Sequence, residues 1–168
     1  LHKLGTDTWS KAKRKALEQI HDVAAELLHI QARRQSKPGF AFELDHTGYM
    51  QFSSGFAYEE TLDQANAIDA TLHDMQLAKP MDRLVCGDVG FGKTEVAMRA
   101  AFVAVQNNKQ VAVLVPTTLL AQQHHESFKD RFADTAVRIE VLSRFGSNKT
   151  HLKIIEDLAE GKVDIVIG

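Results

Sequence analysis

Short apolar, β-branched runs alternate with helical segments from residue 83 onward, and this alternation constrains the fold more than any other feature. The runs lie at residues 83–86, 111–115, 137–142 and 163–167, and the helical segments between them at residues 95–105, 117–132 and 148–159. Strands that alternate with helices pair in parallel, because each crossover helix returns the chain to the same end of the sheet. Runs that are apolar throughout indicate strands covered on both faces. The pattern therefore predicts an α/β fold with a parallel sheet and flanking helices.

A long amphipathic helix is predicted ahead of this region, at residues 7–34. Its apolar side chains recur at three- and four-residue steps, at Trp9, Ala12, Ala16, Ile20, Val23, Leu27 and Ile30. Thr6 or Asp7 is expected to cap its start. One helix cannot bury such a stripe by itself, so we expect it to lie against a neighbouring domain as a connector.

An aromatic-rich segment follows this helix, which Pro38 and Gly39 are expected to end. Turn-forming residues lie at 46–48 and 53–55, and the segment is interpreted either as a small hairpin or as an irregular wrap. A further helix is predicted at residues 61–75, where Thr61 and Gln64 have the spacing of a capping box.

Composition excludes several classes of protein. The chain has 168 residues, a net charge of −2 and one cysteine, Cys86, so it holds no internal disulfide framework and we expect a reducing, cytoplasmic setting. Cys86 is expected to pack in the core on a buried strand. No apolar run reaches the roughly 20 residues that cross a bilayer, so no membrane partner is expected. The eight histidines and the cysteine lack the ligand spacing of a zinc site.

The strongest chemical signal is a glycine-rich motif between a predicted strand and a predicted helix. Its residues are Gly87, Asp88, Val89, Gly90, Phe91, Gly92, Lys93 and Thr94, followed by Glu95, and they satisfy G-x-x-x-x-G-K-T. The glycines let backbone N–H groups turn inward around phosphate oxygens, and the following helix adds its unpaired amides. Lys93 is expected to reach the β- and γ-phosphates, and the Thr94 hydroxyl to bind Mg²⁺. The motif therefore predicts binding of ATP and Mg²⁺, with Lys93 and Thr94 as catalytic residues.

The base-binding side of this site has two interpretations. The amide of Gln64 offers both a donor and an acceptor, which suits the edge of adenine, and Phe56 or Tyr58 would stack on the base. Alternatively, Gln64 only completes the capping box with Thr61. A GTPase would need N-K-x-D, and the run from Asn148 to His151 lacks the aspartate.

The motif region resembles a known family. Residues 81–101, residues 113–124 and the triplet of Ser143, Arg144 and Phe145 closely resemble bacterial transcription-repair coupling factors, which are superfamily 2 DNA translocases. Residues 1–5 and Trp9 resemble the same family just ahead of its motor. RecG-type fork-remodelling helicases share the Pro-Thr-x-x-Leu-Ala-x-Gln-His pattern.

This resemblance implies a fold and a function. It implies the N-terminal part of a RecA-like, ATP-binding motor domain at residues 61–168, after a connector helix at 1–37 and a linking segment at 38–60. ATP hydrolysis would drive the motor along double-stranded DNA, displacing stalled RNA polymerase and recruiting excision-repair proteins. Those two partners would bind through parts outside this chain.

Residue roles follow from the same resemblance. Gln64 becomes the adenine reader, and Lys93 and Thr94 become the phosphate and Mg²⁺ ligands. Thr117, Thr118 and Gln122 belong to the first DNA motif, and Ser143, Arg144 and Phe145 line the same track. Helix-start amides and hydroxyls at the carboxyl edge of a sheet suit phosphates, although Thr117 also suits a helix N-cap and Arg144 an ordinary loop.

Three alternatives stay open. A RecG-like helicase fragment is one, against which the long upstream helix argues. The others are a non-motor P-loop switch or kinase, and a binding module with a vestigial pocket. The sequence offers no Asp-Glu pair on a later strand to hold Mg²⁺, and no second motor domain. We therefore expect this chain alone to bind nucleotide weakly and scarcely to hydrolyse it.

Overall fold

The structure, a computed structural model, describes residues 7–168. Thr6 as a helix cap, and the resemblance of residues 1–5, lie outside the described residues. Along the described chain the elements are α1 (Asp7–Gln35), α2 (His46–Ser54), α3 (Leu62–Met75), α4 (Lys93–Gln106), β1 (Val111–Val113), α5 (Thr118–Arg131), β2 (Ile139–Val141), α6 (Asn148–Ala159) and β3 (Ile165–Ile167).

The three strands form one parallel sheet in the order β1-β3-β2, so β3 is central. Ile165 on β3 aligns with Val111 on β1 and with Ile139 on β2. Ile165 and Ile167 point to the same face of the central strand and are fully buried, whereas Val166 on the opposite face is half-buried. The predicted α/β fold with a parallel sheet and flanking helices is therefore confirmed.

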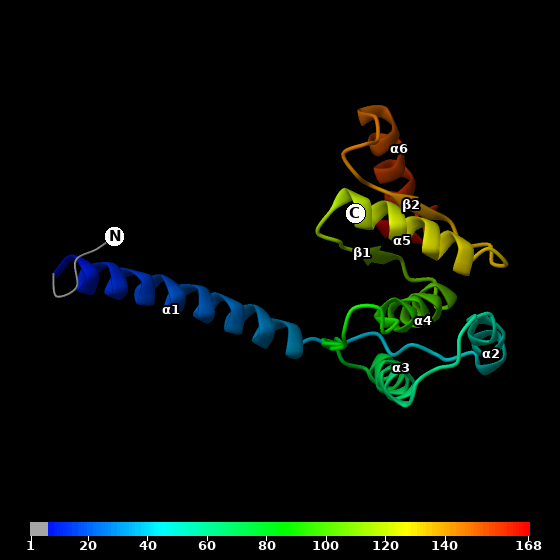
Figure 1. Cartoon of the computed structure of the whole chain (residues 1–168), viewed down its shortest axis with the longest axis horizontal. Coiled ribbons are helices and arrows are strands. Elements are labelled where there is room, and N and C mark those ends of the chain that lie inside the picture. The colour runs from blue at the N-terminus through cyan, green and yellow to red at the C-terminus, as the bar shows by residue number, and fades with distance from the viewer. Residues whose placement is uncertain (1–6) are drawn as a thin grey trace.

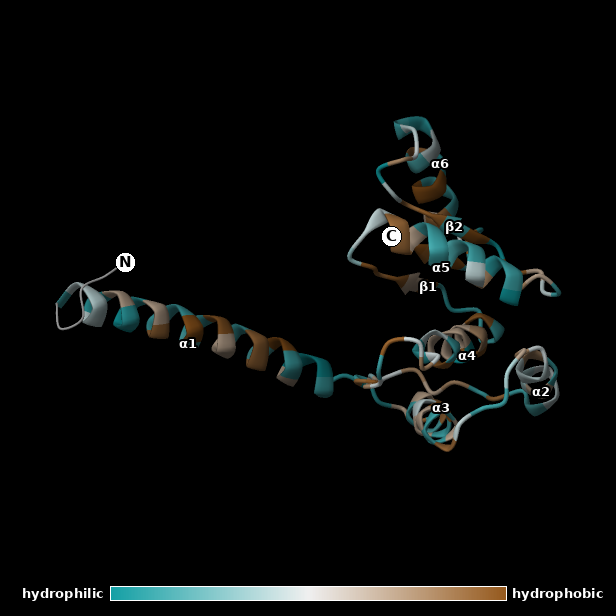
Figure 2. Ribbon diagram, in the orientation of Figure 1, coloured by the Kyte–Doolittle hydropathy of each residue, from teal (hydrophilic) through white to brown (hydrophobic). Residues whose placement is uncertain are grey.

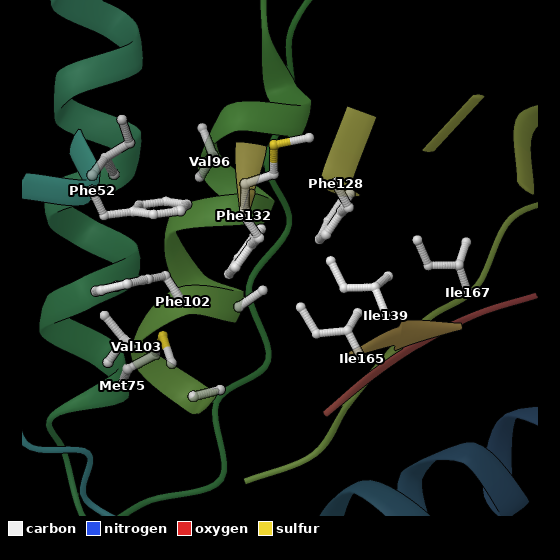
Figure 3. Packing of buried hydrophobic residues seen from close by; sticks show 14 of the residues in the cluster. Phe52, Met75, Val96, Phe102, Val103, Phe128, Phe132, Ile139, Ile165 and Ile167 are labelled. Atoms are coloured by element: carbon white, nitrogen blue, oxygen red, sulfur yellow. The ribbon is translucent and has the colours of Figure 1, made fainter. Parts of the chain in front are cut away.

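A continuous apolar core joins the sheet to the helices. Figure 3 shows it running from Phe52 and Phe102 through Phe132 and Phe128 to the isoleucines of the strands. The rings of Phe52 and Phe102 stack with centroids 4.3 Å apart. Helix α4 occupies the centre, since it contacts α2, α3 and β1. The helix that begins in the glycine-rich motif thus lies at the centre of the core.

The predicted strand at residues 83–86 is wrong. These residues are irregular, and no strand among residues 7–168 pairs with them. Leu84 is 86% exposed, and Cys86 is exposed as well, so the expected packing of Cys86 in the core is also wrong. A strand forms only where a neighbouring strand takes up its backbone hydrogen bonds, and an apolar run alone does not supply one.

The aromatic-rich segment is neither a hairpin nor an irregular wrap, because it contains helix α2. The Asp45 side chain accepts a hydrogen bond from the Thr47 N–H at 3.1 Å and caps the helix start. Phe52 then anchors the helix in the core. Residues 46–48, predicted as a turn, are the first turn of this helix, since the cap at Asp45 outweighs the helix-weakening effect of Gly48.

Helix α1 extends away from the rest of the molecule (Figure 1). Its predicted extent is confirmed, and none of its residues is buried. Figure 2 shows hydrophobic residues along it between hydrophilic ones, and Ile20, for example, is 63% exposed. At its end the Arg34 guanidinium donates to the Met81 carbonyl at 2.5 Å. Over residues 7–168, no helix combines the length and apolar character needed to span a bilayer.

Candidate functional site

The glycine-rich motif forms a tight loop that leads directly into α4. Gly90 and Gly92 have φ angles of +87° and +71°, in the left-handed region that favours glycine. Gly92 is the N-cap of α4 and offers no side chain to the first-turn N–H groups. A Cβ on Gly92 would lie 2.4 Å from Nε2 of Gln64. The loop therefore leaves backbone amides at a helix start, where an anion binds favourably.

The Lys93 side chain folds back over the loop. Its ammonium donates hydrogen bonds to the carbonyl oxygens of Gly87 and Asp88, both at 2.6 Å. An ammonium has three N–H groups, so one remains for a ligand. The carbonyls thus hold the positive charge of Lys93 beside the loop.

Gln64 joins the start of α3 to the same loop. Its Oε1 accepts from the Thr61 N–H at 2.8 Å, and the Thr61 hydroxyl accepts from the Gln64 N–H at 3.2 Å. The capping box is therefore confirmed. In addition, Nε2 of Gln64 donates to the Phe91 carbonyl at 2.8 Å. Nε2 keeps a second N–H and Oε1 a second lone pair, so the role in reading adenine stays a prediction.

A cleft of about 730 Å³ opens beside the loop. It brings together most of the residues predicted to bind nucleotide, namely Phe56, Gln64, Gly90, Phe91, Gly92, Thr94 and Glu95. Gly87, Asp88 and Lys93 line a smaller adjoining hollow, which Gln64 and Phe91 also border. Val89 lines neither and is 97% exposed.

Glu95 has a role that sequence reasoning missed. It was predicted to bind the cofactor, but its carboxylate is buried and paired with two arginines. Oε1 accepts from Nε of Arg99 at 2.8 Å and from Nη2 of Arg131 at 2.9 Å. The side chain therefore stabilises the start of α4. It borders the cleft, but its carboxylate oxygens already accept hydrogen bonds from the two arginines.

Arg99 is the centre of this buried network. Besides Glu95, it donates to Oε1 of Glu60 at 2.5 Å and to the Tyr49 hydroxyl at 3.3 Å. Burial disfavours the charge of Arg99, but its bonds to Tyr49, Glu95 and Glu60 outweigh that effect and raise its pKa. Burial raises the pKa of the Tyr49 hydroxyl, and the bond from Arg99 partly offsets this. Arg99 therefore stays charged and Tyr49 neutral near pH 7.

The last turn of α5 also lines the cleft, through Ser127, Asp130 and Arg131. None of these was predicted. Arg131 follows the buried Phe128 by three residues, so it lies beside the core-facing side of the helix. An arginine at such a position needs a carboxylate partner. That signal was present in the sequence, but spacing could not identify Glu95 as the partner.

Five of the six residues predicted to bind DNA lie at one edge of the sheet, and the sixth, Gln122, lies within α5. Thr117 and Thr118 follow β1, and Ser143, Arg144 and Phe145 follow β2, the two strands on either side of β3. Because all three strands are parallel, these residues lie at their shared carboxyl edge, where α/β folds bind ligands. The Arg144 guanidinium lies 5.6 Å from the centre of the exposed Phe145 ring.

Two of these residues already have partners. The Thr117 hydroxyl accepts from the Leu120 N–H at 3.2 Å, so Thr117 is the N-cap of α5 as its alternative interpretation required. The Gln122 amide donates to Glu126 at 2.9 Å. Helix α5 thus begins at the predicted DNA residues and ends at the cleft.

The site suits a magnesium–phosphate group better than a free metal ion. Within residues 7–168, no group of three His, Cys, Asp or Glu side chains is arranged to hold a metal. Thr94 supplies a hydroxyl at the cleft. Mg²⁺ commonly takes few protein ligands and several phosphate oxygens, so the donor set fits an ion that arrives with a nucleotide.

A G-x-x-x-x-G-K-T loop that leads directly into a helix, in a chain that also forms a parallel sheet, indicates the class of P-loop proteins with a RecA-like fold. The family model described as DEAD/DEAH box helicase matches residues 61–168. The chain belongs to the DEAD/DEAH box helicase family.

Individual proteins within this family are similar to the chain over its whole length. All 168 residues align with transcription-repair-coupling factors, at 65% identity in Haemophilus influenzae, 63% in Escherichia coli and 49% in Bacillus subtilis. The chain spans only about 15% of the length of the first two. Among solved structures it is similar to RecG bound to a three-way DNA junction, with a TM-score of 0.77 and 31% identity over 83% of this chain and 19% of that one.

Proposed function

We propose that this chain is the ATP-binding part of an ATP-dependent double-stranded DNA translocase that displaces stalled RNA polymerase and couples transcription to nucleotide excision repair. The observation that carries the proposal is the cleft in which the glycine loop, Gln64 and Phe56 meet. Similarity to the transcription-repair-coupling factors extends over the whole chain and includes the long helix α1. This similarity over the whole chain favours a transcription-repair-coupling factor over a RecG-like helicase. The likeness to RecG supports the motor fold that the two kinds of protein share.

The cleft suggests a role for each residue that binds ATP. Phe56 would stack on adenine, and the remaining N–H and lone pair of Gln64 would meet its polar edge. Amides around Gly90 and Gly92, with the third N–H of Lys93, would hold the phosphates. Thr94 would bind Mg²⁺, which neutralises phosphate charge during transfer. Lys93 and Thr94 are therefore the proposed catalytic residues.

The DNA track would run along the carboxyl edge of the sheet. Thr117, Thr118 and the amides at the start of α5 would contact phosphates, as would Arg144, without reading sequence. Phe145 is exposed beside Arg144 and would pack against the sugar edge. Ser143 and Gln122 complete this proposed set. RNA polymerase and excision-repair proteins would bind outside this chain.

We further propose that residues 61–168 form the N-terminal part of the motor domain, after the connector helix of residues 1–37 and the linking segment of residues 38–60. Phosphoryl transfer relies on positioned charges, and the sequence offers no Asp-Glu pair on a later strand to hold Mg²⁺. The chain alone should therefore hydrolyse ATP at a small fraction of the rate of the full-length gene product.

Triplex displacement tests the motor function. The full-length gene product should strip a third strand from duplex DNA only with hydrolysable ATP, and should release RNA polymerase stalled on a template. Lys93→Ala should remove both activities while the protein stays folded. A wild-type protein that hydrolyses ATP but displaces neither would rule out the translocase, and equal activity of the variant would rule out this site.

A further inference from the structure

We propose that His151, on α6, is a positioning residue for the DNA track, because its ring supports the turn that presents Arg144 and Phe145. This inference rests on the proposed function, since it assumes that these two residues contact DNA. It gives a role to a half-buried side chain outside the proposed set of DNA contacts, and it explains why the turn carries a glycine at residue 146.

Arg144 and Phe145 lie at the tip of a tight turn. The Gly146 N–H donates to the Ser143 carbonyl at 3.0 Å and closes the turn, so Arg144 and Phe145 are its two central residues. Within the described chain, neither of these two residues takes part in a backbone–backbone hydrogen bond. The direction in which the turn presents their side chains therefore depends on what packs against it.

The ring of His151 packs against the residue that closes the turn. A Cβ on Gly146 would lie 2.2 Å from Nε2 of His151 and 2.8 Å from Cδ2, and the three atoms nearest to it all belong to this ring. The ring thus occupies the space where a side chain of residue 146 would lie. Gly146 lacks the left-handed φ that strains other residues, so the ring, and not the backbone, excludes a larger residue there.

This contact acts through shape and not through a hydrogen bond. Nε2 of His151 is buried and has no hydrogen-bond partner among residues 7–168. Van der Waals contact with Gly146 is therefore what links the ring to the turn. An apolar ring of similar shape would make the same contact and would avoid the destabilising effect of a buried polar atom without a partner.

Helix α6 holds the other end of the His151 side chain in place. The Ser147 hydroxyl caps the helix by accepting from the Thr150 N–H at 3.1 Å, and the His151 N–H donates to the Ser147 carbonyl at 3.0 Å. Ile154, three residues further along the helix, is buried. Side chains on a helix lean toward its N-terminus, which directs the His151 ring back toward the turn.

The nucleotide site is anchored independently of this contact. The glycine loop is held by the bond from Gln64 to the Phe91 carbonyl and by the bonds from Lys93 to two carbonyls of the loop. His151 takes part in none of them. Loosening the turn should therefore weaken contacts to DNA and leave the binding of Mg-ATP in place.

The test measures the affinity of the full-length gene product for duplex DNA, at one fixed salt concentration. The probe is a fluorescein-labelled duplex followed by anisotropy, with an ATP analogue that is not hydrolysed. His151→Ala should weaken binding about threefold to tenfold, the effect of having to order a loosened turn on binding. His151→Phe should restore the affinity, because it keeps a ring against Gly146. Affinity for Mg-ATP, measured by calorimetry, should equal that of wild type in both variants.

Gly146→Ala tests the same contact from the other side. Its Cβ should displace the ring and weaken DNA binding about as much as His151→Ala. In a protein that already carries His151→Ala, the same change should have little further effect, because the Cβ then meets no ring. Leu152→Ala is the control on the same helix, since Leu152 is the next residue and is 62% exposed. It should bind DNA like wild type.

Arg144→Ala separates the two proposals, because it removes a proposed DNA contact directly. Wild type that does not bind DNA, or Arg144→Ala that binds as tightly as wild type, contradicts the proposed DNA track. If Arg144→Ala weakens binding while His151→Ala and Gly146→Ala do not, the positioning role is overturned and the proposed function stands.

The positioning role is also overturned if His151→Phe binds DNA as weakly as His151→Ala, or if the effects of His151→Ala and Gly146→Ala simply add. A parallel loss of Mg-ATP affinity would show a general effect on the fold and would overturn it too. If His151→Ala fails to fold by circular dichroism, Gly146→Ala and His151→Phe decide.

Discussion

The buried carboxylate of Glu95 should contribute more to stability than any exposed acidic group of the protein. Glu95→Ala removes the acceptor of hydrogen bonds from Arg99 at 2.8 Å and from Arg131 at 2.9 Å and 3.3 Å. Breaking a buried ion pair by removing one partner costs about 3–5 kcal/mol, because the other charge stays buried and unpaired.

The surroundings place the expected cost near the lower end of this range. Arg99 keeps its bonds to Glu60 and Tyr49, and Arg131 keeps its position over the Phe52 ring, 3.9 Å from the ring centre. Both arginines therefore keep contacts that partly offset the loss of the Glu95 carboxylate. We expect the free energy of unfolding to fall by about 3 kcal/mol, a large part of the 5–15 kcal/mol typical of a domain.

Urea denaturation followed by far-ultraviolet circular dichroism measures this change. Glu126→Ala is the control, because Glu126 is also a helical glutamate with a partner one turn away, Gln122, but is exposed. It should change the free energy of unfolding by no more than about 0.5 kcal/mol. A loss below about 1 kcal/mol for Glu95→Ala, or equal losses for both variants, would refute the reasoning.

Three further predictions concern the loop, the core and an ion pair. Gly92→Ala should lower the melting temperature and weaken Mg-ATP binding in calorimetry, because a Cβ at φ +71° is strained by about 1–2 kcal/mol and would meet Gln64. Phe128→Ala should lower the free energy of unfolding in urea by about 3–5 kcal/mol, since its ring is 1% exposed and stacks on Phe132; a loss below 1 kcal/mol would show that this part of the core is not packed as described. The hydrogen bond from Arg138 lowers the pKa of Asp157 from 3.8, so its stabilisation is present above that pH and lost as the pH falls through the lowered value. Asp157→Asn should flatten the acid limb of melting temperature against pH, and an unchanged limb would contradict this.

Local signals explain why most helices were predicted well. Helix α6 spans the predicted residues 148–159, and Ser147 caps it by accepting from the Thr150 N–H. Thr61 and Thr117 cap α3 and α5 in the same way. A cap and the apolar period that follows lie within a few residues of each other, so the sequence shows both without knowledge of the fold.

Tertiary partners explain what could not be predicted. Residues 83–86 have the composition of a strand, but whether they form one depends on a neighbouring strand that composition does not reveal. The bond between Glu95 and Arg131 joins side chains 36 residues apart. No periodicity connects them, and only the packing of α5 beside α4 brings them together. The glycine loop was predictable because its chemistry lies in eight consecutive residues, whereas the base-binding wall draws on several elements.

The central claim is that the loop around Gly90 and Gly92, with Lys93 and Thr94, holds a nucleoside triphosphate with its magnesium ion. Titration calorimetry of Mg-ATP into the full-length gene product tests it most directly. Wild type should show saturable binding, and Lys93→Ala should stay folded but bind at least about tenfold more weakly, as expected for losing one charge-assisted contact. A folded wild-type protein without saturable binding, or a variant that binds as tightly, would contradict the account.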